Sequence, residues 1–424
     1  MSNILVISMK EHMHSRCILR EMQMFVENRE MIDIETLYFS FSKTLLRSVG
    51  LWPHQHMRLI QLQYILSFGI LLTVIVFHFT TFMTAECTSD LIVKVLASMF
   101  VFINIIVKYS SFWVNRVTMK ILLEQLQKIC SELKDENELA IIAKYGNISR
   151  SYTIWFTVHF ICGESFFILI QSWSSILDFV RPQNESRPRI ILFPMEYFVD
   201  QQRYFCLILL HINIALCIAG ITLVGALALL FACQECVCGM FTIANYRIKY
   251  SMRYNSLRNV DLTDKNLISE RITRAVDIHR KAMKYSKFLM SRFEVAFGFL
   301  TMTVVITLTL NLFRIFQIMS SEFNIMELIL PVAWAISIIL YMFLVNYIGQ
   351  DLTDHHTQIF VTVYNIQWYK APLHVQKSIL FLLQKGSKDF TLTVGSIING
   401  SLKSFAMLTN TSISYFTVLY STQK

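Results

Sequence analysis

The chain has 424 residues, of which 54% are hydrophobic and only 16% are charged, and its mean hydropathy is +0.48. A soluble globular domain carries about 25% charged residues, so this composition argues against an ordinary soluble protein and indicates a membrane protein with several spans. The net charge of +9 is interpreted as basic cytoplasmic loops rather than as a surface for nucleic acid.

Seven apolar segments are long enough to cross a bilayer, which takes about 20 helical residues. They are 59–82, 91–112, 151–173, 204–232, 295–313, 328–349 and 403–424. Lys94 and Lys108 lie within about one turn of the ends of the second segment, where we expect their side chains to extend toward the interface. A further apolar stretch, 390–402, is the main ambiguity in this count.

Lysine and arginine are distributed unevenly between the two alternating sets of loops. One set holds 28 of them and the other holds 6. Because cytoplasmic loops are the basic ones, the N-terminus is predicted to be cytoplasmic and, with seven spans, the C-terminus extracellular. This orientation is the reverse of that of receptors coupled to G proteins, and the Asp/Glu-Arg-Tyr and Asn-Pro-x-x-Tyr signatures of that class are absent from the sequence.

The fold class expected is therefore an all-α polytopic membrane protein. We divide it into a cytoplasmic segment 1–58, a six-helix bundle 59–349, cytoplasmic anchor helices 350–402 and a last spanning helix 403–424. The bundle includes a long cytoplasmic loop, 233–287, whose apolar residues recur three to four apart and predict one helix that continues into the fifth span. Apolar helices outside the bilayer must be covered, which favours contacts between subunits over packing within one chain.

Chemistry that would need a cofactor or metal is not indicated. The segment CQECVCG contains Cys233, Cys236 and Cys238, but no second pair follows at zinc spacing, so a juxtamembrane thiol cluster is the preferred interpretation. The histidine pairs 54/56 and 355/356 lack helix-facing carboxylates. No nucleophile–base constellation or nucleotide motif is present, so we expect no enzyme, cofactor or metal site. Asn184, in a sequon of the second outer loop, is the candidate for glycosylation.

The last apolar segment carries hydroxyls at helical spacing. Thr411, Ser414, Val418, Ser421 and Thr422 are expected on one face, opposite Ser412, Tyr415, Phe416 and Leu419. No charged side chain occurs from Phe405 to Gln423. Hydroxyls can contact hydrated ions without trapping them, although small hydroxyl residues also permit close helix packing in membranes.

Three stretches carry a family resemblance. NYIGQDLTDHHTQIFVTVYNIQWYKAPLHVQKSILFLLQ, SLKSFAMLTNTSISYFTVL and FPMEYFVDQQRYF resemble the insect odorant receptors. The resemblance implies an odorant-gated, non-selective cation channel, assembled as a tetramer with the family's co-receptor in the plasma membrane of olfactory sensory neurons. It places Val418 at a hydrophobic gate, whereas Thr422 stands where the family has a bulky apolar residue. Since the loop before the fifth span has no obvious insertion, the chain looks like an odorant-tuning subunit and not the co-receptor. The alternatives are a metabotropic receptor and, less favoured, a transporter.

The same resemblance implies that a small volatile odorant binds within the outer half of the bundle. Such a pocket is mostly apolar and aromatic with few polar groups. The positions that fit are Met99, Phe100, Ile103, Phe160, Gly163, Glu164, Phe167, His211, Ile212, Ala215, Trp334 and Ser337. Taken singly, each can equally be a packing residue. Glu164 costs at least about 2.5 kcal/mol at mid-membrane depth, so it is either a polar pocket contact or a hydrogen-bond partner of another helix, with His211 or Asn213 as the expected partner.

Overall fold

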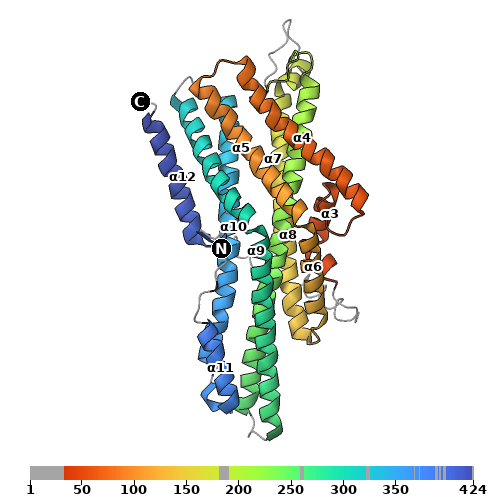
Figure 1. Cartoon of the computed structure of the whole chain (residues 1–424), viewed down its shortest axis with the longest axis vertical. Helices are drawn as coiled ribbons and strands as arrows, with labels where there is room; N and C mark the ends of the chain where they lie inside the picture. The colour runs from red at the N-terminus through yellow and green to blue at the C-terminus, as the bar shows by residue number, and fades with distance from the viewer. Residues whose placement is uncertain are drawn as a thin grey trace, which may run out of the picture.

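Long helices make up most of the chain in the computed structural model (Figure 1). The structure describes residues 33–180, 191–257, 262–320, 325–366, 368–371, 373–386, 390, 393–394 and 398–422. Its elements are α2 (Ile34–Tyr38), α3 (Ser40–Ser48), α4 (Met57–Thr84), α5 (Ser89–Val114), α6 (Arg116–Ser131), α7 (Glu136–Val180), α8 (Phe205–Leu257), α9 (Leu262–Ser320), α10 (Ile325–Asn365), η1 (Trp368–Lys370), α11 (Leu373–Gly386), β1 (Thr393–Val394), β2 (Ile398–Asn399) and α12 (Leu402–Thr422).

Six helices within the described ranges are long and apolar enough to cross a membrane: α4, α5, α7, α8, α9 and α10. They confirm the all-α polytopic class and lie at the first six predicted spans. The seventh predicted span forms α12, whose 21 residues extend for about 30 Å, the thickness of a bilayer core. Its hydroxyl side chains lower its hydropathy, and that it spans the membrane stays a prediction.

Several helices continue well beyond the apolar core, as the periodicity indicated. The helix α9 runs for 59 residues without a break, from the predicted loop into the fifth span. Near the C-terminal end of the chain, η1 stops at Lys370 and α11 starts at Leu373, so the anchor helices are interrupted there.

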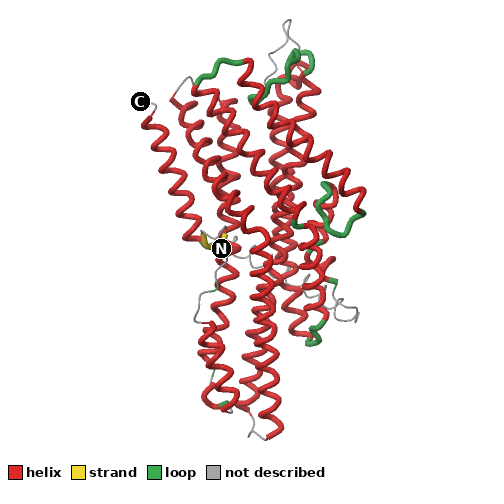
Figure 2. The backbone as a smooth tube through the Cα atoms, viewed as in Figure 1, coloured by secondary structure: helices red, strands yellow, loops and turns green. Residues whose placement is uncertain are grey.

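The described residues of the ambiguous stretch 390–402 form no helix before Leu402, so the expectation of anchor helices through residue 402 was wrong there. Its described part forms a short antiparallel pair, β1 with β2, at the base of α12 (Figure 2). β-branched residues next to Gly395 and Gly400 in the sequence TLTVGSIING favour extended chain and turns over helix.

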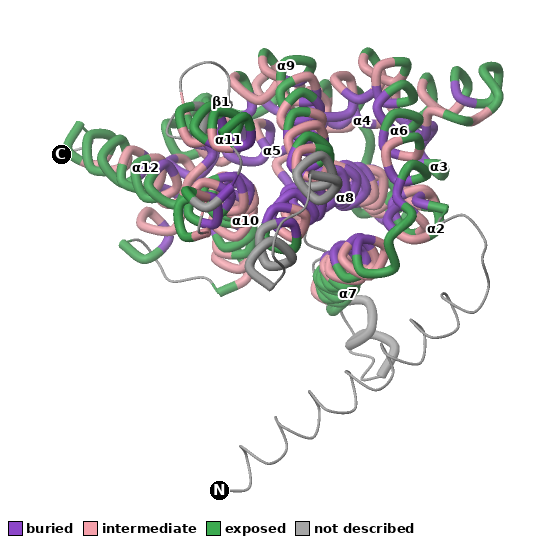
Figure 3. The backbone as a smooth tube through the Cα atoms, turned by 90° about the horizontal axis from the view of Figure 1, so that it is seen from below, coloured by how far each residue is buried: buried purple, intermediate pink, exposed green. Residues whose placement is uncertain are grey.

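The helix α8 is the axis of the bundle. Its apolar window is 61% buried, against 11% for α7 and 17% for α10, and Figure 3 shows it surrounded by the other helices. One large buried cluster lies in the lower half of Figure 1, where α2, α3 and α6 pack on the long helices. A smaller one lies in the upper half, between α4, α5, α8 and the loop before α8. α12 stands at the side of the bundle and packs on α9 and α10.

Candidate functional site: an upper pocket and an exposed helix face

Hydrogen bonds hold the loop before α8 against α4, in the upper half of the bundle. The Thr80 hydroxyl donates to the Glu196 carbonyl at 2.6 Å, and the Thr81 hydroxyl donates to the Pro194 carbonyl at 3.1 Å. The ring of His211 on α8 contacts both α4 and the loop. Its Nε2 lies 2.9 Å from the Thr73 hydroxyl, and its Nδ1 lies 2.9 Å from the Tyr197 hydroxyl. His211 therefore connects α8, α4 and the loop.

Four predicted pocket residues meet in the apolar cluster beneath this loop: Phe167, Ile212, Ala215 and Trp334. Phe193 of the loop, which the sequence analysis missed, packs its ring 5.6 Å from that of Phe167 and 5.9 Å from that of Phe102. A loop residue gave no periodic signal, because its place over the helices depends on how the loop folds back. The sequence pattern thus named four residues of this cluster and missed Phe193.

Other predicted pocket residues lie elsewhere. Met99 is buried, and Phe100 and Ile103 are half-buried on α5. Gly163 and Ser337 are exposed in the isolated chain. The ring of Phe160 occupies the space beside Gly220 of α8, where an added Cβ would lie only 1.7 Å from a ring carbon, so this pair is a close helix–helix contact.

Glu164 has a different partner from the two that were expected. Neither His211 nor Asn213 binds its carboxylate; the Cys217 thiol, one turn further along α8, donates to Glu164 Oε1 at 3.9 Å. Spacing along α7 and α8 did not reveal how the two helices are aligned along their axes, and the partner depends on that alignment.

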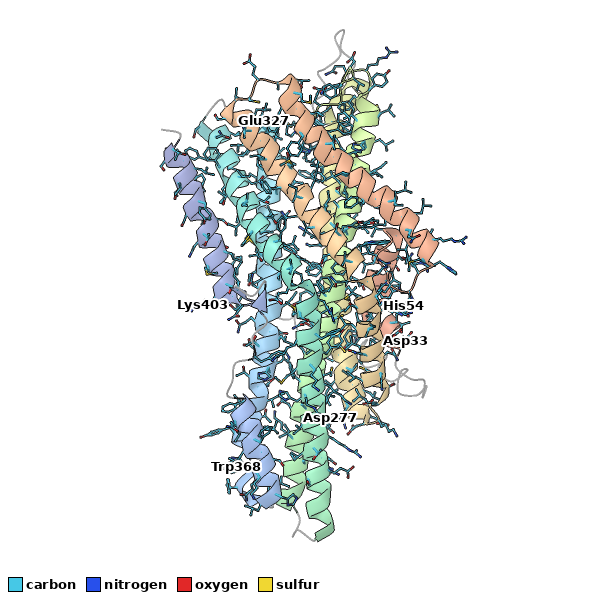
Figure 4. The ribbon with its side chains drawn as sticks, in the orientation of Figure 1. Asp33, His54, Asp277, Glu327, Trp368 and Lys403 are labelled. Carbon is cyan, nitrogen blue, oxygen red and sulfur yellow. The ribbon has the colours of Figure 1, made fainter. Side chains whose placement is uncertain are left out.

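A cavity of about 150 Å³ lies beside this cluster, between α5, the loop, α9 and α10. Trp334 lines it, and its buried indole Nε1 has no acceptor among the residues described. At one side, buried Arg314 of α9 pairs with Asp90 and, at 2.6 Å, with Glu327, which also lies 3.7 Å from Lys94 (Figure 4). The cavity is thus apolar on the Trp334 side and ionic on the other.

The helix α12 buries one face and exposes the other. Ser404 and Ser412 are buried, the Thr309 hydroxyl donates to the Ser412 carbonyl at 3.2 Å, and the ring of Phe316 packs 4.6 Å from that of Tyr420. The predicted pore residues lie away from this contact: Ser414, Val418, Ser421 and Thr422 are exposed and Thr411 is half-buried. Val418 is 57% exposed.

A groove of about 780 Å³ runs between α9 and α12 beside that face, lined by Thr411, Tyr415, Val418 and Leu419. The prediction that Tyr415 and Leu419 lie on the opposite face was therefore wrong. At about 100° per residue, Tyr415 is only about 40° from Thr411, so both share a side of the helix. The hydroxyls of Ser414 and Ser421 donate to carbonyls of their own helix, at 2.9 and 2.8 Å, which leaves their oxygen lone pairs outward.

Comparison with known proteins assigns this architecture to a family. The family model of the 7tm odorant receptors matches residues 88–413, most of the chain. The chain belongs to the odorant receptor family. Olfactory receptor OR5 of Machilis hrabei in complex with eugenol has the same fold, with a TM-score of 0.71 over 92% of this receptor and 100% of OR5 at 15% identity. A second OR5 structure gives 0.68 over 90% and 97%, also at 15% identity. No curated protein sequence matches the receptor.

Two further predictions concern modification and metal. Asn184 lies outside the described residues. Cys238, Asp351 and His355, from α8 and α10, bring their ligand atoms within 4.8 Å of one another. Both nitrogens of His355 already have hydrogen-bond partners, the Asp351 carbonyl at 2.8 Å and the Tyr145 hydroxyl at 2.7 Å. The expectation that this histidine lacks a helix-facing carboxylate was wrong, because Asp351 lies one turn before it on α10, with Oδ1 at 3.5 Å from His355 Nδ1.

Proposed function

We propose that this receptor is the ligand-binding subunit of an odorant-gated, non-selective cation channel that works with the family's co-receptor. The observation that carries the proposal is the division of α12 into two faces. One face is fixed to α9 by Ser412 and Tyr420, and the other presents hydroxyls and Val418 without a charged side chain. A face of this kind suits a hydrated cation path shared with other subunits, where an apolar ring can close the path by dewetting.

We propose that a small volatile odorant binds in the upper half of the bundle. The apolar cluster around Phe167 and Ile212, with the polar atoms of His211 and Trp334 nearby, has the composition of a small-molecule site. The related receptor OR5 has been determined in complex with eugenol, which supports this class of ligand. The helix α9 lines the upper cavity at Arg314 and contacts α12 at Thr309. It is therefore the element that would connect odorant binding to the pore.

Current recordings test the channel proposal. Cells expressing the receptor together with a co-receptor are expected to give an odorant-evoked cation current, and cells expressing either chain alone are not. Val418→Ala is expected to raise the leak current or shift gating, because it removes apolar bulk from the proposed constriction. The matched control is Ile413→Ala, an exposed position on the same helix about 140° away. Robust current from the receptor alone, or equal effects of both substitutions, would contradict the proposal.

We further propose that the upper end of the bundle faces outward, at the olfactory neuron's dendritic or ciliary surface. The end of α12 lies there with the α4–α5 connection, the end of α9 and the start of α10 (Figure 1), and the basic loops belong to the other end. An epitope after Lys424 should be stained on intact cells. Staining only after permeabilisation would favour the metabotropic alternative.

A further inference from the structure

The group formed by Cys238, Asp351 and His355 lies at the end of the bundle to which the basic loops belong. Cys238 follows the fourth predicted span on α8, and the other two residues follow the sixth on α10. One ligand atom from each residue lies within 4.8 Å of the other two. Asp351 and His355 are one turn apart, so they share a side of α10. The fold thus brings together a thiol, a carboxylate and an imidazole from helices whose contributing residues, Cys238 and Asp351, are 113 positions apart.

The distances within this group match those between the ligands of one zinc ion. Cys238 Sγ lies 3.7 Å from Asp351 Oδ2, and His355 Nδ1 lies 3.5 Å from Asp351 Oδ1. Zinc bonds of about 2.0 Å to nitrogen or oxygen and about 2.3 Å to sulfur place neighbouring tetrahedral ligands about 3.3–3.6 Å apart. Small rotations of these side chains would therefore complete the three bonds.

The hydrogen bonds of His355 are compatible with an ion on Nδ1. Its Nε2 lies 2.7 Å from the Tyr145 hydroxyl, which lies 2.8 Å from the Thr242 hydroxyl. A hydrogen bond on the other ring nitrogen usually fixes the orientation of a metal-bound histidine. The bond from Nδ1 to the Asp351 carbonyl, at 2.8 Å, would be lost. That carbonyl still accepts from the His355 backbone amide within α10, so it is not left without a donor.

Glu235 adds a second carboxylate beside this group. It lies one turn before Cys238 on α8, and it is near enough to Asp351 and to Cys238 to interact with both electrostatically. Glu235 is only 5% exposed, and none of the described residues donates a hydrogen bond to it or forms an ion pair with it. Buried charges in proteins are paired or coordinate metals, and neighbouring carboxylates repel each other when both are ionised. A divalent cation would relieve both costs.

We propose that Cys238, Asp351 and His355 bind a zinc ion, with Glu235 as a neighbouring negative charge and water in the fourth position. Thiolate and imidazole ligands favour zinc over magnesium and calcium, which prefer oxygen. Binding releases the Cys238 thiol proton to solvent, and the imidazole proton is then on Nε2, from which it is donated to the Tyr145 hydroxyl. The side chains of Asp351 and His355 are 33% and 19% exposed, which gives the ion a route from solvent.

The site lies near the base of the last helix. Gly349, two residues before Asp351 on α10, packs so closely on Gly400 that an added Cβ would lie 2.6 Å from the Gly400 carbonyl oxygen. An ion that fixes α10 to α8 would therefore restrict the segment on which α12 rests. The expected consequence is a more stable bundle and not a chemical reaction.

Metal titration of the purified, tag-free, full-length receptor tests the site. After removal of metals with a chelator and dialysis, zinc is expected to bind with one ion per chain and to raise the thermal midpoint. Magnesium at the same concentration is expected to do neither. Cobalt(II) in place of zinc is expected to show a thiolate-to-cobalt charge-transfer band in the near ultraviolet, together with the d–d bands of a tetrahedral ion, so it reports a cysteine ligand directly.

Substitutions locate the ion. Cys238→Ser should remove the charge-transfer band, and Asp351→Asn should weaken zinc binding at least tenfold. Glu235→Gln should weaken binding severalfold and keep the band, because it removes a charge but not the thiolate. The matched control is Cys233→Ser, which removes another buried thiol of α8 from outside the group and should change neither the band nor the affinity.

The partly exposed Asp351 keeps the test decisive if Cys238→Ser does not yield folded protein, since Asp351→Asn changes the shape of its side chain little. No zinc binding by the wild type, or a cobalt spectrum without the charge-transfer band, would overturn the proposal. So would a band that persists in Cys238→Ser, or equal zinc affinity of Asp351→Asn and the wild type.

Discussion

In the upper ion-pair cluster, Asp90 and Glu327 should stabilise the fold chiefly by neutralising Arg314, the most buried of the three side chains. Its side chain is only 7% exposed, whereas those of Asp90 and Glu327 are 56% and 43% exposed. The two carboxylates also lie in the first turns of α5 and α10, where the helix dipole stabilises negative charge. Without the arginine, solvent and the helix dipoles still stabilise the two carboxylates. Without the carboxylates, the buried arginine has no comparable stabilisation.

This asymmetry sets the size of each effect. Arg314→Met leaves two solvated carboxylates and should lower the free energy of unfolding by about 1 kcal/mol. The double variant Asp90→Asn with Glu327→Gln leaves a buried guanidinium unpaired and should cost about 3–5 kcal/mol. Adding Arg314→Met to that double variant should recover most of the loss, because a buried ion pair replaced by apolar groups is often nearly neutral.

The measurement is the midpoint of heat-induced loss of the monodisperse peak of detergent-solubilised receptor in size-exclusion chromatography. Only the rank order of the midpoints is compared, because heat unfolding of such a protein is irreversible. The expected order is wild type, then Arg314→Met and the triple variant together, then the double variant. Arg280→Met, which breaks the exposed pair with Asp277, serves as the control and should change little. If Arg314→Met falls as far as the double variant, burial of the arginine is not the dominant effect.

Two further predictions concern packing. Gly349→Ala should displace the base of α12 and lower surface expression, because its Cβ would lie 2.6 Å from the Gly400 carbonyl oxygen; Gly69→Ala, with nothing within 4 Å, should be tolerated, and equal behaviour in a surface-labelling assay would refute this. His211→Phe removes two hydrogen bonds, each contributing about 0.5–1.5 kcal/mol, and should lower the thermal midpoint and raise the odorant concentration for half-maximal current. An unchanged midpoint would show that the loop is held by its other contacts.

The sequence predicted most of the helical framework and only part of the site. Apolar length located six spans, and apolar periodicity predicted the long helix α9. The secondary structure of the stretch 390–402 was harder to predict, because a short apolar run fits a strand and a helix equally. In the upper apolar cluster, the sequence analysis named Phe167 and Ile212 as candidates, whereas it missed Phe193 because loops have no helical period.

By itself the sequence determined that this is an all-α membrane protein, where six of its spans lie and which loops are basic, because these follow from the composition of contiguous segments. Only the tertiary structure decided which side chains are buried and which charges are paired. Lys108 meets Tyr341, and Arg314 meets Asp90, across 233 and 224 residues of chain. The cost of burying a charge depends on such partners, and partners on other helices leave no trace in the local pattern of either one.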